Sequence, residues 1–183
     1  MKWRYLWLLP AAFSLCGMEF EAESGKLLQA EKEAYQGASG NLIVRFKGAA
    51  QMDVKKVDPA NPDLQIPFRT EKDGAWQISA VVCTETTNND SFYYRVDAGP
   101  LRTCFPGFPR KCVSRTLRTE VLEAGNHLLS FSRREPNCGL DKVILKPVAA
   151  PPLAVVSFPG KPGQDALYTL KARPGSYYVR IYA

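Results

Sequence analysis

Five cysteines are the residues whose type and spacing most directly predict chemistry in this 183-residue chain. Cys16 lies in an apolar N-terminal run, and the other four occupy the middle of the sequence: Cys83, Cys104, Cys112 and Cys138. If the chain is exported, an even number of cysteines predicts disulfides, here two, although four cysteines allow three pairings. The spacing favours Cys104–Cys112, which would close a short loop rich in Pro and Gly. Cys83 would then pair with Cys138 across the domain.

Other chemistries have weaker signals. A zinc site is not favoured, because the cysteines contain no CxxC pair and His127 is the single histidine. The sequence has no nucleophile elbow and no Gly-rich phosphate loop. Spacing does not test for the paired carboxylates of a glycosidase, because residues far apart in sequence can meet. We therefore expect a binding protein rather than an enzyme.

The first 17 residues have the pattern of a signal peptide. Lys2 and Arg4 precede the almost wholly apolar run 5–17, and charge returns at Glu19. The run is too short to cross a bilayer as a helix. A buried N-terminal strand is the alternative, but the run lacks the alternation of a strand. We expect a secreted or periplasmic protein, with the cell surface as a further option.

Cys16 also raises the question of a lipid anchor. The three residues before it are Phe13, Ser14 and Leu15. A lipobox usually has a small residue where Leu15 stands. Lipidation at Cys16 is therefore the less favoured interpretation.

The charge of the chain argues against a nucleic-acid partner. Without residues 1–17, which include Lys2 and Arg4, the chain has 22 basic and 18 acidic residues, a net charge of about +4. These charges form no basic stripe interleaved with aromatic residues, which a nucleic-acid-binding surface would show.

Short apolar runs separated by turn residues predict an all-β domain. The sequence contains 14 prolines and 13 glycines, which helix interiors tolerate poorly. Trp76, Ile78, Ala80 and Val82 alternate with other residues, as on one face of a strand. We predict strands at 41–47, 76–84, 91–97, 116–122, 127–133 and 140–146. Many short strands at even spacing predict an antiparallel β-sandwich over residues 18–147.

The C-terminal part of the chain follows a different pattern. Residues 148–153 read as a Pro-rich linker, and residues 154–183 contain two apolar runs around Arg173-Pro174-Gly175. These runs predict a β-hairpin extension. An isolated hairpin is marginally stable in water. We expect it to pack on the sandwich, to pair with a protein partner, or to belong to a larger unit.

Several segments, in their order and spacing, resemble a known fold family. The segments are Glu21–Gly25, Gly37–Gly40, Asp90-Ser91-Phe92, Arg95-Val96-Asp97, Gly99-Pro100, Ala124–Leu128, Arg134-Glu135-Pro136 and Leu140–Val143. Together they resemble the galactose-binding-like jelly rolls of the family 6 and family 35 carbohydrate-binding modules over about residues 19–147. The resemblance implies a non-catalytic module that binds carbohydrate. A structural or adhesive protein of a bacterial cell-envelope assembly is the alternative, because one fold serves many binding roles.

The resemblance also implies a structural calcium ion at the edge of the sandwich. Glu21, Glu23 and Asp141 fall where these modules carry acidic ligands, and calcium prefers such oxygen donors. Glu21 and Glu23 are two residues apart, so on a strand both carboxylates would point the same way. A solvated acidic face is the alternative interpretation.

By the same resemblance, aromatic rings in loops at one end of the domain would bind the sugar, with a polar side chain orienting it. The matching residues are Tyr35, Phe105 or Phe108, and Asn137. Arg110 and the adjacent Lys111 make the loop of Phe105 and Phe108 cationic. An acidic sugar such as a uronate is therefore an alternative ligand. Ordinary packing under the loops is the competing interpretation of each aromatic residue.

Overall fold

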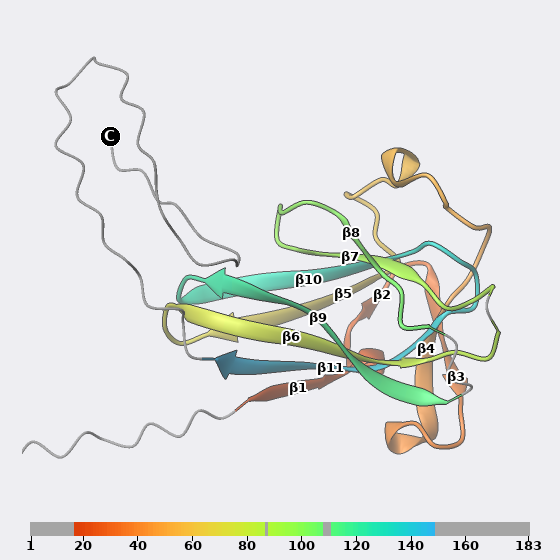
Figure 1. Ribbon diagram of the computed structural model, residues 1–183, viewed down its shortest axis with the longest axis horizontal. Helices are drawn as coiled ribbons and strands as arrows, with labels where there is room; N and C mark the ends of the chain where they lie inside the picture. The colour runs from red at the N-terminus through yellow and green to blue at the C-terminus, as the bar shows by residue number, and fades with distance from the viewer. Residues whose placement is uncertain (1–16, 87, 108–110, 149–183) are drawn as a thin grey trace, which may run out of the picture. The chain divides into compact units, whose positions relative to one another are not determined.

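Two antiparallel sheets make up the part of the chain that the computed structural model describes, residues 17–86, 88–107 and 111–148 (Figure 1). Sheet 1 contains β1 (Met18–Glu21), β3 (Ala30–Ala34), β4 (Leu42–Phe46), β6 (Gly74–Cys83), β9 (Cys112–Leu122) and β11 (Gly139–Val148). Sheet 2 contains β2 (Lys26–Leu27), β5 (Leu64–Thr70), β7 (Phe92–Val96), β8 (Arg102–Cys104) and β10 (Gly125–Arg133). The helical turns in these ranges are the short η1 (Ala22–Ser24), η2 (Ser39–Asn41) and η3 (Val54–Lys56). None of them is long and apolar enough to cross a membrane.

Some predicted features lie outside the described residues. They are Cys16 and nearly all of the signal peptide, Phe108, Arg110, the linker beyond Val148 and the C-terminal hairpin. The predicted β-sandwich itself is confirmed, and each of the six predicted strands corresponds to an observed one. The sequence pattern did not predict the short β1, β2, β3 and β8, nor the longer β5, whose residues alternate between buried and more exposed positions. Pro67 of β5 lacks an N–H group. Because β2 pairs with β5 only at Leu64 and Gln65, Pro67 needs no hydrogen-bond donor on the edge of β5 that faces β2.

The core lies between the inward faces of the two sheets. Trp76, Ile78, Ala80 and Val82 of β6 are buried, as their alternation predicts. Aromatic residues of sheet 2 meet them in one cluster, and the Phe92 ring contacts the Phe131 ring at 5.6 Å between centroids. Burial of this apolar surface is the main force that holds the sheets together.

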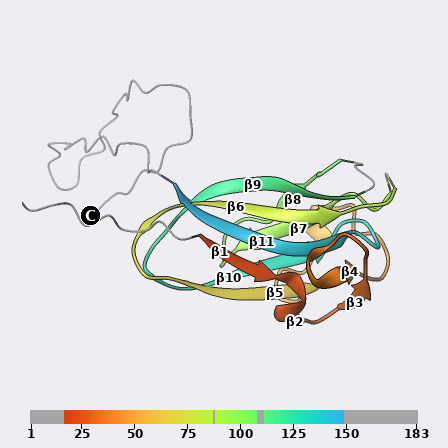
Figure 2. The ribbon, with the colours of Figure 1, turned by 90° about the horizontal axis from the view of Figure 1, so that it is seen from below.

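Strand β11 organises sheet 1. It lies between β6 on one side and both β4 and β1 on the other, and Figure 2 shows it between β6 and β1. β4 pairs with Gly139 and Leu140, and β1 pairs with β11 from Lys142 onward. The register with β6 shifts at the same place, which leaves Asp141 as a bulge residue. The bulge therefore falls where β4 gives way to β1.

The predicted disulfide pairings are wrong. Cys83 is bonded to Cys112, its cross-strand partner on β9, while Cys104 and Cys138 are buried free thiols. The physical reason is the side-chain alternation of β6. Val82 points into the core, so its neighbour Cys83 points to the outer face of sheet 1. A residue on the outer face cannot bridge the sandwich, but it can reach the residue directly opposite on the next strand.

Candidate functional site

A pocket of about 500 Å³ lies at one end of sheet 1. Its walls come from β3, β4, the loop after β6 and the loop before β11. The lining residues are almost all polar or charged: Glu33, Arg45, Glu85, Thr86, Asn88, Asn89, Pro136 and Asn137. A concave surface that gathers hydrogen-bonding groups from four segments is a candidate ligand site.

Arg45 of β4 joins all four of these segments. Its Nε donates to Glu33 Oε1 at 3.2 Å, its Nη1 to the Asn137 carbonyl at 2.7 Å and its Nη2 to Glu85 Oε1 at 2.5 Å. The Arg45 side chain is only 3% exposed, so its charge must be paired within the protein. The guanidinium therefore fixes the pocket walls rather than offering free donors to a ligand.

Gly139 makes room for the Arg45 side chain. Gly139 lies directly between Arg45 of β4 and Cys83 of β6 in the sheet register. A methyl group on Gly139 would lie 2.8 Å from Ile43 Cδ1, 2.9 Å from the Cys83 carbonyl and 3.4 Å from Arg45 Nη1. A side chain at position 139 would therefore overlap Ile43 and the Cys83 carbonyl, so the close packing beside Arg45 depends on glycine.

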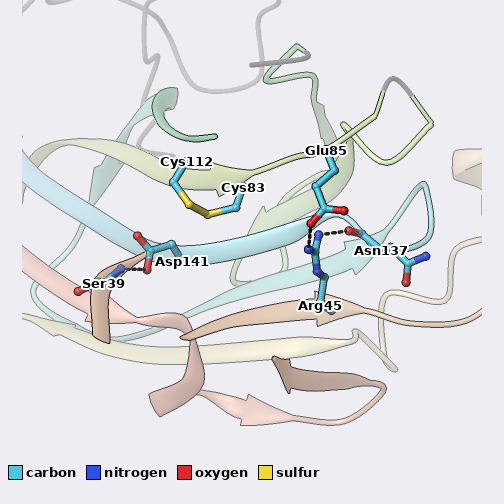
Figure 3. Close-up of a disulfide and its surroundings, with 7 residues drawn as sticks. All are labelled: Ser39, Arg45, Cys83, Glu85, Cys112, Asn137 and Asp141. Carbon is cyan, nitrogen blue, oxygen red and sulfur yellow. Dashed lines mark hydrogen bonds and ion pairs between the residues drawn. A yellow bond between two sulfur atoms is a disulfide. The ribbon is translucent and has the colours of Figure 1, made fainter. Parts of the chain in front are cut away.

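The disulfide supports the same region. Cys83–Cys112 joins β6 to β9 and lies on the outer face of sheet 1, two residues before Glu85 (Figure 3). The loop that carries Glu85 is held from its other end by Asn89. The Asn89 side chain accepts hydrogen bonds from the backbone N–H groups of Glu85 at 3.3 Å and Thr86 at 2.8 Å. The wall formed by Glu85 is thus fixed before any ligand binds.

Electrostatics keep the Glu33 carboxylate charged. Partial burial pushes its pKa upward, but the positive charges and hydrogen bonds of Arg45 and Lys47 outweigh burial and lower the pKa of Glu33 below its usual value. Lys47 Nζ lies 3.3 Å from Glu33 Oε2. The pocket therefore combines two acidic side chains, Glu33 and Glu85, with one guanidinium that is already paired.

Of the predicted sugar-binding residues, Asn137 lines this pocket, and Tyr35 lies outside the lining but contacts its Arg45 wall. The Arg45 guanidinium carbon lies over the Tyr35 ring, 5.4 Å from the ring centroid, and Tyr35 is partly buried. Asn137 lines the pocket with an exposed side chain. Its backbone has a φ of 62° and is fixed by an N–H donated to the Phe46 carbonyl at 2.7 Å. The carboxamide therefore projects from a rigid backbone.

Phe105 lies elsewhere and does not line the pocket. Its ring is 61% exposed and stacks against the Arg134 guanidinium, 4.5 Å from the ring centroid. Arg134 in turn donates to Ser91 Oγ at 2.7 Å and pairs with Glu135 at 3.2 Å. Phe105 thus belongs to a separate surface cluster. The other predicted loop residues, Phe108 and Arg110, lie outside the described residues.

The three predicted metal ligands lie around the bulge in β11. Ser39 connects two of them, because its N–H donates to Asp141 Oδ1 and its hydroxyl to Glu21 Oε1, both at 2.9 Å. Burial raises the pKa of Asp141, and the hydrogen bond from Ser39 lowers it. The negative charges of Glu21 and Glu23 raise it further, so the net shift is upward. The three acidic groups therefore lie close enough for their charges to interact.

The donor chemistry of this acidic cluster suits a hard cation. Glu21 Oε2 and Glu23 Oε2 are buried without a hydrogen-bond partner, which is costly for an acceptor. Carboxylate oxygens of this kind are the ligands that calcium prefers. In the described ranges, however, no three Asp, Glu, His or Cys side chains already have the spacing of a metal centre.

No motif in the sequence predicts Glu33, Arg45 and Glu85 as site residues. One signal was present, because Arg45 interrupts the apolar run Leu42–Phe46, and a charge at a buried strand position needs a partner. Nothing in the sequence identified Glu33 and Glu85 as those partners. They lie 12 and 40 residues from Arg45 and meet it only through the sheet order.

The described sandwich is similar to several solved structures. The sandwich is similar to a Podospora anserina β-(1,4)-mannanase that carries a family 35 carbohydrate-binding module, with a TM-score of 0.62, 15% identity and coverage of 76% of this chain. This chain spans only 29% of that mannanase. It matches a Clostridium thermocellum family 35 carbohydrate-binding module over 74% of this chain and 99% of the module, with a TM-score of 0.56 and 13% identity.

A third similar structure is the C-terminal family 6 module of LamC from Zobellia galactanivorans, with a TM-score of 0.51, 12% identity and coverage of 72% of this chain and 99% of the module. No protein-family model and no curated protein matches the sequence. The described domain therefore has the jelly-roll fold of the family 35 and family 6 carbohydrate-binding modules.

Proposed function

We propose that this chain is a non-catalytic carbohydrate-binding module whose sugar site is the pocket around Arg45. The observation that supports this most strongly is a preformed polar pocket that includes Asn137, one of the residues that the resemblance assigns to sugar binding. Sugar hydroxyls both donate and accept hydrogen bonds, so they suit a wall of carboxylates and carboxamides. Tyr35 adds an aromatic ring beside that wall, and such rings pack on the apolar face of a pyranose.

The charge of the pocket favours a neutral sugar. The Glu33 and Glu85 side chains line the pocket and are 41% and 54% exposed, and Arg45 already donates three hydrogen bonds to the protein. A uronate carboxylate would meet two like charges in this pocket, which disfavours its binding. The alternative of an acidic sugar depends on the Arg110 loop, which lies outside the described residues.

A glycan panel tests both parts of this proposal. Wild-type protein should bind neutral oligosaccharides and bind their uronate counterparts more weakly. Glu85→Gln should keep neutral binding and reduce the discrimination against uronates, because the amide removes one negative charge and retains an acceptor. If uronates bind the wild type best, the charge argument is wrong. If no glycan binds, carbohydrate binding itself is refuted and the cell-envelope assembly hypothesis takes its place.

We also propose that the chain is exported, on the basis of its N-terminal sequence. The Cys83–Cys112 disulfide supports export, because disulfides persist in oxidising compartments and are rare in the cytosol. Mass determination of the protein secreted by a bacterial host tests the predicted loss of residues 1–17.

Calcium binding at the bulge is a separate proposal. Glu21, Glu23 and Asp141 would hold the ion, which would neutralise their mutual repulsion and supply a partner for the two orphaned carboxylate oxygens. Its role would be structural, because it would tie η1 and β1 to β11.

A further inference from the structure

The two free cysteines, Cys104 and Cys138, both point into the core from opposite sheets. Cys104 of β8 lies directly opposite Phe92 of β7 in the sheet register, and directly opposed residues share a face of the sheet. Phe92 is fully buried between the sheets, so Cys104 faces inward with it. Cys138 precedes β11 and lies two residues from the buried Leu140, which places both on the inner face of sheet 1.

A pair of aromatic residues brings the two cysteines to the same part of the core. The rings of Phe46 in sheet 1 and Phe92 in sheet 2 contact each other, 6.0 Å apart at an angle of 61°. The Phe46 N–H donates to the Cys138 carbonyl at 3.1 Å, and Phe92 is the strand partner of Cys104. Each cysteine is therefore a direct neighbour of one ring in a contact that spans the two sheets.

We propose that Cys104 and Cys138 form a second disulfide, which joins sheet 1 to sheet 2. The bond forms when the two thiols lose two protons and two electrons to a small-molecule disulfide such as oxidised glutathione, which is reduced to two thiols. Disulfides that cross a β-sandwich are established in other folds. Cys83–Cys112 joins neighbouring strands within one sheet, so it cannot supply this link.

The pKa values of the two reduced thiols determine how fast the disulfide can form in the folded protein. Burial raises the pKa of the Cys104 thiol to about 12. Burial also raises the pKa of Cys138, and the nearby Cys104 thiolate would raise it further. Since the thiolate is the reactive form, the folded reduced protein should oxidise slowly. Oxidation must therefore take place during folding, before the core closes.

Tryptic peptide mapping tests this pairing, because each of the four cysteines of the sandwich falls in its own tryptic peptide. The peptides are 73–95 for Cys83, 103–110 for Cys104, 112–115 for Cys112 and 135–142 for Cys138. The full chain is refolded in a mixture of reduced and oxidised glutathione, denatured without reductant, alkylated and digested. We expect peptide 103–110 linked to peptide 135–142.

The double variant Cys83→Ser/Cys112→Ser is the matched control, because only the proposed pair remains in the sandwich. It should still give the linked peptides. Alkylated Cys104 and Cys138 in the refolded wild type would overturn the proposal. A link from either cysteine to Cys83 or Cys112 would also overturn it.

Discussion

Replacement of Arg45 by Met tests whether this residue holds the pocket together. Met has a flexible, unbranched and uncharged side chain, so Arg45→Met removes three hydrogen bonds while it still fills the part of the buried space that the Arg45 methylene groups occupy. Removing one partner of a fully buried ion pair costs about 3–5 kcal/mol. The Glu33 and Glu85 side chains are 41% and 54% exposed, and water can partly replace their lost partner. We therefore expect a loss of about 2 kcal/mol in the free energy of unfolding.

Urea denaturation measures this loss. With an m-value of about 2 kcal/mol/M, the midpoint should fall by about 1 M. Arg69→Met is the matched control, because Arg69 pairs with Glu71 in a bridge whose side chains are 62% and 84% exposed. That variant should lose less than about 0.5 kcal/mol. If Arg45→Met costs no more than Arg69→Met, the buried guanidinium does not hold the walls of the pocket.

Three further predictions follow from the same geometry. Gly139→Ala should destabilise the domain by about 1–3 kcal/mol through overpacking, whereas Gly74→Ala, whose methyl group would lie 3.7 Å from Trp76, should be tolerated; equal midpoints in urea would contradict this. The pKa of Glu33 is lowered in the folded state, so its contribution to stability is present above about pH 4.5 and is lost at lower pH. Glu33→Gln should therefore reduce the change in unfolding free energy over that pH range. An unchanged pH dependence would count against the ion pair. Asp141→Asn should stabilise the metal-free protein at pH 7, because the pKa of Asp141 is raised. It should also abolish the rise in Tm on adding calcium. A wild-type Tm that changes with neither calcium nor chelator would refute the metal site.

The sandwich could be predicted because its signals are local. The alternation of Trp76, Ile78, Ala80 and Val82 identifies a strand with one buried face, and the observed β6 buries those four residues. The same alternation also places Cys83 on the opposite face. It therefore contained the information needed to reject the Cys83–Cys138 pairing.

The pocket could be predicted only in part, because it depends on sheet order. Tyr35 and Asn137 were reached through a family resemblance, and their meeting depends on Arg45, which contacts both. Arg45 of β4 bonds to Glu85 after β6, and β11 lies between these two strands with Gly139 between Arg45 and Cys83. No spacing in the sequence specifies that order of strands.

Calorimetric titration of the best-binding neutral oligosaccharide tests the central claim most directly. Tyr35→Ala removes the ring beside Arg45, and Asn137→Gly removes the carboxamide while it preserves the positive φ. Met52→Ala, at a 56% exposed apolar residue that does not line the pocket, is the control. We predict that the first two variants keep the wild-type Tm and lose measurable binding, whereas Met52→Ala binds like the wild type. Undiminished binding by both pocket variants, with the fold intact, would contradict the account.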